Sequence, residues 1–349
     1  PPPPPRDSLG KKRYSIRYKL LVVFGLLVVV SIFMLGLLAL SMAKRAVTEK
    51  VEMQLKDKAQ DTAEIIDGRI NAFVQFLEGI ARMPIFRDPS ATYTEKLSTL
   101  KKEILYNDML FEAAITDLNG NMYHTQNKQV LSVSDRTWFQ ETLKGKKFVM
   151  EPYYSRATDK MIIVFSIPVY YDNRNITNVL AVGILASWLS DQIDDIVVGK
   201  TGYSYILGLT GNTIAHKNEE LVKNQANAIT LAKKDNSYAE LAFFMQHALE
   251  TDESEIGYYS YKGVKNIASY ATIKTTDWIV VILAPYDEFM GTVQTLQYSM
   301  LIIGGVILVV ALIIVYFVAT RMVHPIQNTV LALQGIAQGE GDLTVRLQL

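Results

Sequence analysis

Two long apolar segments constrain this 349-residue chain more than any other feature of its sequence. Residues 20–42 and 298–320 contain no charged side chain. At about 1.5 Å per residue, a helix of either length crosses the roughly 30 Å hydrocarbon core of a bilayer. A cleaved signal peptide is the alternative for the first segment, but its apolar run exceeds the roughly 7–15 residues usual in such peptides. The sequence therefore predicts two transmembrane helices joined by residues 43–297.

The charges beside these segments predict how the chain is oriented. Six basic residues lie within positions 1–19, and Arg321 and His324 follow the second segment. Positively charged flanks favour the cytoplasmic side. We therefore expect both ends, including a tail at 1–19, in the cytoplasm and residues 43–297 outside the cell membrane. The absence of charge within the apolar segments argues against an ion pathway.

The composition excludes several classes of function. Lys and Arg together number 35, as do Asp and Glu, so no strong positive field favours nucleic acid as a partner. The chain has no cysteine, which excludes disulfides, thiolate metal sites and cysteine nucleophiles. Its four histidines are scattered, and no phosphate loop or serine-nucleophile motif is present. We expect no enzyme activity and no metal or cofactor in the outer region.

The outer region begins with a pattern typical of one long helix. Residues 43–83 contain no proline and repeat apolar residues at the spacing of a single helix face. This stripe consists of Ile66, Ile70, Phe73, Leu77 and Ile80. It either pairs with a second subunit or covers the rest of the outer region, and both readings stay open. Pro84 is expected to end the helix.

Beyond Pro84 the pattern changes to short apolar runs separated by turn residues, as in β-sheets. The runs on either side of Asn119-Gly120 predict a hairpin, and two longer runs further along predict buried strands. A second group of predicted strands follows a helical stretch around 189–198, and a polar, mostly helical stretch at 219–250 divides that group. The expected fold class is therefore α+β, with one module at 84–192 and another at 193–290.

Residues 135–160 bring together the side chains best suited to binding a small anion. Arg136 lies close in sequence to Trp138 and Phe139, and Tyr153 follows. A guanidinium offers a forked pair of donors to a carboxylate, while aromatic faces pack against the rest of a ligand. The alternative is that the rings belong to the core and Arg136 is a solvated surface charge.

Four short sequences follow one another in a characteristic order. They are Asp-Arg-x-Trp-Phe at 135–139, Glu-Pro-Tyr at 151–153, Gly-Lys-Thr-Gly-Tyr at 199–203 and Ala-Pro-Tyr at 284–286. In this order they resemble a bacterial methyl-accepting chemotaxis receptor with a double Cache (dCache) ectodomain. The resemblance implies two PAS-like Cache modules on the long helix, membrane-distal at 84–192 and membrane-proximal at 193–290.

The end of the chain resembles a HAMP signal-transducing linker. His-Pro-Ile at 324–326 and Gly-Glu-Gly-Asp-Leu-Thr at 339–344 carry this likeness, which places the linker at 321–349. Apolar residues at suitable spacing supply a seam for a parallel helix bundle. They are Ile326, Val330, Leu333 and Ile336.

The resemblance implies a homodimeric chemoreceptor in the bacterial inner membrane. It would bind a small molecule in the membrane-distal module and signal through HAMP to a cytoplasmic kinase and coupling protein. The same sensor on a membrane-anchored histidine kinase or diguanylate cyclase is the alternative. A surface adhesion protein would not explain the HAMP-like end.

In amino-acid-binding members of this family, an arginine and a tryptophan hold the ligand carboxylate, and two aspartates hold its ammonium group. This chain retains the first half, but Ser155 and Ser187 stand where the aspartates are expected. Because a buried ammonium group without an acid is costly, we expect a carboxylate, neutral or aromatic ligand to be favoured over standard amino acids. The candidate ligand-binding residues are Arg136, Trp138, Phe139, Tyr153, Ser155 and Ser187.

Overall fold

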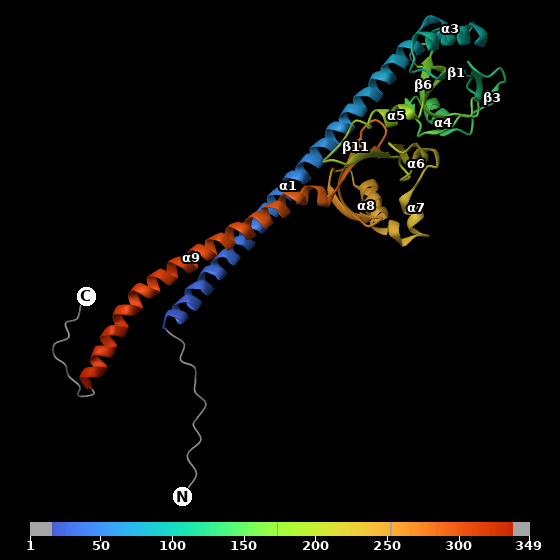
Figure 1. The fold of residues 1–349 in the computed structure, drawn as a ribbon. Coiled ribbons are helices and arrows are strands. Elements are labelled where there is room, and N and C mark those ends of the chain that lie inside the picture. Colours follow the sequence, from blue (N-terminus) through green and yellow to red (C-terminus); the bar gives the residue numbers. More distant parts are fainter. Residues whose placement is uncertain (1–15, 173, 252, 338–349) are drawn as a thin grey trace. The chain divides into compact units, whose positions relative to one another are not determined.

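The computed structural model describes residues 16–172, 174–251 and 253–337, with side chains described between 18 and 322 (Figure 1). By its contacts the chain divides into two compact units. One contains the chain up to Val47 and from Met290, and the other is Thr48–Phe289, here called the sensor unit. All strands of the described residues lie in the sensor unit.

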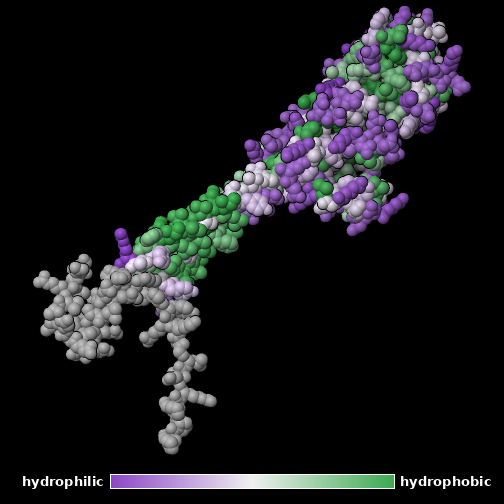
Figure 2. All heavy atoms as spheres, viewed as in Figure 1, coloured by the Kyte–Doolittle hydropathy of each residue, from purple (hydrophilic) through white to green (hydrophobic). Residues whose placement is uncertain are grey.

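Two long helices carry the apolar segments. Helix α1 runs from Ile16 to Ala81 and α9 from Tyr286 to Ala337, and each is long and apolar enough to cross a membrane. Figure 2 shows apolar side chains gathered on the parts of both helices outside the sensor unit. Helix α9 continues into the expected HAMP segment, whereas its Gly-Glu-Gly-Asp-Leu-Thr motif at 339–344 lies outside the described residues.

The first module, which follows α1 and ends with Asp191, is built on a seven-stranded antiparallel sheet. The strand order is β3-β2-β1-β7-β6-β4, and β5 also pairs with β6. Its strands are β1 Glu112–Thr116, β2 Asn121–His124, β3 Leu131–Ser132, β4 Phe148–Val149, β5 Tyr153–Tyr154, β6 Met161–Tyr170 and β7 Ile176–Leu185. The predicted hairpin is confirmed: β1 pairs with β2, and Gly120 in the turn has a φ of 82° that favours glycine.

Short helices complete the first module. They are α2 Pro84–Arg87, α3 Tyr93–Tyr106, α4 Thr137–Leu143 and α5 Ser187–Asp191. Helix α4 is fastened to the sheet by the buried hydroxyls of Thr142 and Ser166, which lie 2.7 Å apart. This contact holds the end of α4. Ser166 Oγ also donates to the Trp138 carbonyl oxygen at 3.3 Å, which holds the start of α4, and with it Arg136, beside the sheet.

The second module, the part of the sensor unit after Asp191, contains a five-stranded antiparallel sheet of order β10-β11-β12-β8-β9. Its strands are β8 Tyr203–Leu207, β9 Thr213–His216, β10 Ile256–Tyr261, β11 Val264–Ile273 and β12 Trp278–Pro285. Between β9 and β10 come α6 Glu219–Lys223, α7 Ala228–Ala232, the 3-10 helix η1 Asn236–Tyr238 and α8 Ala239–Glu250. Phe244 of α8 packs on Tyr259 and Tyr270, which places the core between α8 and the sheet.

The apolar stripe of α1 covers the sensor unit. All five of its residues are buried within the single chain, and the Phe73 ring meets the Phe165 ring of β6 edge-on at 4.7 Å. The neighbouring Ile65 faces away and is 54% exposed. The sequence left open whether this stripe pairs with a second subunit or covers the rest of the outer region. In the structure it packs against the sensor unit of its own chain.

Candidate ligand-binding site

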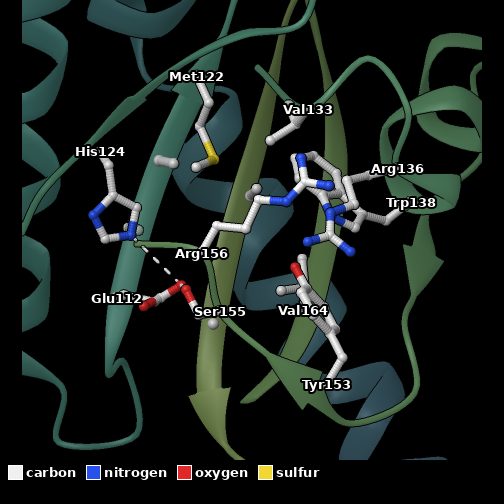
Figure 3. A pocket seen from close by; sticks show the side chains of 14 residues that line it. Glu112, Met122, His124, Val133, Arg136, Trp138, Tyr153, Ser155, Arg156 and Val164 are labelled. Carbon is white, nitrogen blue, oxygen red and sulfur yellow. Dashed lines mark hydrogen bonds and ion pairs between the residues drawn. The ribbon is translucent and has the colours of Figure 1, made fainter. Parts of the chain in front are cut away.

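A pocket lies against the sheet of the first module (Figure 3). Its charged side chains are Glu112 from β1, Arg136 from the residue before α4, and Arg156 from the segment after β5. Strands β1, β7 and β6 lie side by side, which brings together residues more than forty positions apart in sequence. Among the described residues, no group of three or more His, Asp or Glu side chains is placed to hold a metal ion.

Arg136 forms the cationic end of the pocket. Its guanidinium carbon lies 5.0 Å from the centre of the Tyr153 ring, a cation–π contact, and no described carboxylate pairs with it. Trp138 is only 2% exposed, and its indole N–H has no hydrogen-bond acceptor among the described residues. Burial raises the pKa of Tyr153, which keeps its hydroxyl protonated. These donors suit a ligand carboxylate.

Glu112 forms the anionic end of the pocket. It is 6% exposed and accepts hydrogen bonds from Ser155 Oγ at 2.9 Å and Thr158 Oγ1 at 2.6 Å. Burial raises the pKa of Glu112, but His124 and these two hydroxyls outweigh that effect and hold it below its usual value of 4.5. Gly183 of β7 lies opposite Glu112, and a Cβ there would come within 2.6 Å of Glu112 Cγ. The glycine therefore leaves the space in which the buried carboxylate lies.

His124 of β2 stands beside this carboxylate. Its Nδ1 accepts the backbone N–H groups of Gln126 and Asn127 at 3.0 and 3.2 Å. The neutral ring therefore carries its proton on Nε2, which lies 3.5 Å from Glu112 Oε1 and has no other partner among the described residues. His124 presents a donor to the pocket.

Arg156 crosses the pocket and reduces its free space. Figure 3 shows the side chain extending past Glu112 toward Val133 and Trp138. Its guanidinium pairs with Asp135, with Nη2–Oδ2 and Nη1–Oδ1 distances of 2.7 and 3.1 Å. About 20 Å³ remains free, which accommodates about one water molecule.

The structure brings four of the six predicted site residues together. Arg136, Trp138, Tyr153 and Ser155 line the pocket. Phe139 belongs to the adjoining core and contacts the Trp138 ring edge-on. Ser187 is exposed at the start of α5 and does not line the pocket.

Sequence reasoning missed Glu112, His124 and Arg156. Glu112 carries one signal that points to it: it is a lone acid at the start of an otherwise uncharged and fully buried strand. Charged groups are rarely buried without a partner or a purpose.

The segment that carries Tyr153 also contacts the second module. The Leu209 N–H donates to Glu151 Oε1 at 2.6 Å, and Gln225 Nε2 donates to the Pro152 carbonyl oxygen at 3.0 Å. A Cβ at Gly208 would lie 2.5 Å from the Glu151 carboxyl group, so a larger residue there would displace that carboxyl group. One tripeptide therefore joins the pocket to the second module.

A family model for the double Cache domain, described as a Cache domain, matches residues 41–293, most of the chain. The chain belongs to this Cache family. Its relatives are named as chemotaxis receptors. Methyl-accepting chemotaxis protein TlpA of Bacillus subtilis is 24% identical over 97% of this chain and 49% of its own length. PctB of Pseudomonas aeruginosa is 22% identical over 97% and 52%. The chain thus spans about half the length of these relatives.

Solved structures show the same Cache fold. The ligand-binding domain of the Pseudomonas fluorescens chemoreceptor CtaA, in complex with L-isoleucine, aligns with a TM-score of 0.57 at 15% identity, over 72% of this chain and 98% of its own. The PctB ligand-binding domain with L-glutamine aligns with a TM-score of 0.53 at 14% identity, over 71% and 98%.

One expectation from the sequence is wrong. A carboxylate, neutral or aromatic ligand was expected to be favoured over standard amino acids, yet the structural neighbours were solved with isoleucine, glutamine and asparagine. The physical premise also fails, because Ser155 does not leave the pocket without an acid. The acid comes from Glu112, to which Ser155 donates its hydroxyl.

Proposed function

We propose that this protein is a transmembrane chemoreceptor whose first module binds an amino acid. The observation that carries the proposal is one pocket with the Arg136 guanidinium, free of any described acid partner, and the buried Glu112 carboxylate. An amino acid carries the complementary pair of charges. Charge-assisted hydrogen bonds of this kind are stronger than neutral ones, most of all where water is excluded.

The ligand carboxylate binds Arg136 and the Trp138 N–H, and the ligand ammonium group binds Glu112. Ser155 and Thr158 already hold the Glu112 carboxylate in place, so little side-chain freedom is lost on binding. Entry of a ligand requires Arg156 to move, since the space left beside it is too small for an amino acid.

The signal passes from the sensor unit through α9 to a HAMP linker at 321–349 and then to a cytoplasmic chemotaxis kinase and coupling protein. The protein is a homodimer, and residues 1–19 and the end of the chain lie in the cytoplasm. Within the sensor unit, Glu288 at the start of α9 accepts the Lys200 N–H at 2.6 Å, which connects the second module to that helix. A histidine kinase or diguanylate cyclase could carry the same sensor, so the output domain separates the two.

Titration of the full chain in lipid nanodiscs with the twenty standard L-amino acids tests the proposal. At least one is expected to raise the melting temperature, and Arg136→Ala and Glu112→Gln should each abolish that shift. Lys160→Ala, an exposed change in the same stretch of sequence, is the matched control and should leave it intact. A shift that survives Arg136→Ala would place the ligand elsewhere, and no shift with any amino acid would reject the proposal.

A further inference from the structure

We propose that Arg156 is a specificity residue that pairs with a carboxylate on the ligand side chain, so that the pocket selects acidic amino acids. This inference rests on the proposed function and names the ligand within the amino-acid class. It concerns the side chain of the ligand, whereas Arg136 and Glu112 are assigned to the carboxylate and ammonium groups that all amino acids share.

The position of Arg156 supports a direct role in binding. It lines the same pocket as Arg136 and Glu112, and its side chain crosses the space that a ligand would occupy (Figure 3). Any amino acid must displace it, because only about 20 Å³ is free beside it. After it is displaced, the guanidinium lines the side of the occupied pocket and can contact the ligand.

The present partners of Arg156 hold it weakly. The side chains of Arg156 and Asp135 are 45% and 59% exposed, and among the described residues the one further hydrogen bond of Arg156 is to the Ser132 carbonyl oxygen at 3.1 Å. An ion pair in such contact with water contributes about 0–1 kcal/mol. A carboxylate inside the pocket, where water is displaced, competes well for the same guanidinium.

The charge of the pocket favours a ligand with net negative charge. Arg136 and Arg156 line it as cations and Glu112 as the anion, while His124 presents an N–H from its neutral tautomer. A neutral zwitterion leaves Arg156 paired with the exposed Asp135, which does not line the pocket. An acidic amino acid brings the additional carboxylate, which Arg156 can bind with two parallel N–H donors.

The test compares acids with amides of the same shape. Calorimetric titration of the full chain in nanodiscs would use L-aspartate against L-asparagine and L-glutamate against L-glutamine. The better-binding acid is expected to exceed its amide by at least about tenfold, the scale of one charged hydrogen bond. Arg156→Gln should remove this preference and leave amide affinity within about twofold.

Removal of Arg156 also frees Asp135, whose charge would repel an acid without direct contact. Arg156→Gln is therefore also measured in the Asp135→Asn background, where the preference must again disappear. Asp135→Asn alone should keep the preference, since it releases Arg156. Equal affinity for acid and amide, or a preference for the acid that survives Arg156→Gln, overturns the inference about Arg156. In either case the proposed function still holds if amino-acid binding depends on Arg136. If no amino acid binds, both fall.

Discussion

Ser155, where the resemblance led us to expect an aspartate, donates a hydrogen bond to Glu112 of β1. Its hydroxyl oxygen is 2.9 Å from Glu112 Oε1. Because the serine side chain is small and uncharged, it neither crowds nor repels that carboxylate. An aspartate at the same place would put two carboxylates side by side in a buried pocket. Like charges at that distance cannot both ionise cheaply.

An aspartate at position 155 is therefore expected to impair ligand binding. Ser155→Asp should weaken amino-acid binding at least about tenfold, because the added acid is protonated or repels Glu112. Glu112→Gln should also weaken binding, since it removes the only carboxylate among the pocket-lining residues. The double variant Ser155→Asp, Glu112→Gln should recover part of the loss, because a single carboxylate again faces the ammonium group.

Calorimetry on the three variants measures this pattern, and Ser155→Asn, similar in size to aspartate but uncharged, separates crowding from charge. Losses that simply add in the double variant would show that Glu112 and residue 155 do not share a role.

His216 in the second module predicts a pH dependence of stability. Burial, with a smaller effect from Lys217, lowers its pKa from 6.5 to about 4, and its Nδ1 accepts the Asn218 N–H at 2.8 Å. The folded protein therefore keeps His216 neutral where the unfolded chain protonates it. Stability is complete above pH 6.5 and falls as the pH decreases toward 4.

Between pH 7 and pH 5 this residue should cost about 2 kcal/mol of unfolding free energy. Denaturant titrations at both pH values measure the cost, and His216→Gln should reduce the difference by about that amount. His247→Gln serves as the control, because His247 is 48% exposed and pairs with Glu255 at the surface. An unchanged pH dependence in His216→Gln would contradict the assignment.

Among the elements, α1 gives the sharpest comparison of two neighbouring side chains. Ile66 is fully buried and Ile65 is 54% exposed on the same helical turn. Ile66→Ala should destabilise the sensor unit by about 2–5 kcal/mol through lost contacts and a cavity. Ile65→Ala should cost less than about 1 kcal/mol, since a methylene-rich side chain in water gains little from folding.

Thermal unfolding of both variants at low protein concentration measures the difference. Equal losses of stability in the two variants would indicate that the Ile65 face is covered as well. If the cost of Ile65→Ala rises with protein concentration, the covering surface is a second subunit.

Elements with local signals were predictable from the sequence, and the site was only half so. The β1–β2 hairpin follows from Asn119-Gly120, and the burial of β6 and β7 from their apolar runs, because each signal spans a few residues. The Arg136–Trp138 end is equally local. The Glu112–Ser155 contact joins positions 43 residues apart and arises from sheet pairing, which no short pattern encodes.

At the scale of the whole molecule, the absence of cysteine makes the orientation in the membrane directly measurable. Single substitutions Lys19→Cys and Lys233→Cys place one thiol at the start of the first apolar segment and one in the second module. In intact cells a membrane-impermeant maleimide should label Lys233→Cys alone, because residues 43–297 are expected outside. Both should label after lysis, and labelling of Lys19→Cys in intact cells would contradict the orientation.

Glu151 and Tyr153 are separated by one residue, yet one contacts Leu209 of the second module and the other lines the pocket. Binding equilibria that share a structural element are linked, and the coupling is reciprocal. If ligand binding changes the equilibrium constant of the Glu151 contact by some factor, formation of that contact changes the affinity for the ligand by the same factor. Gly208→Ala, a substitution in the second module that displaces the Glu151 carboxyl group, is therefore expected to change the ligand concentration that half-fills the pocket.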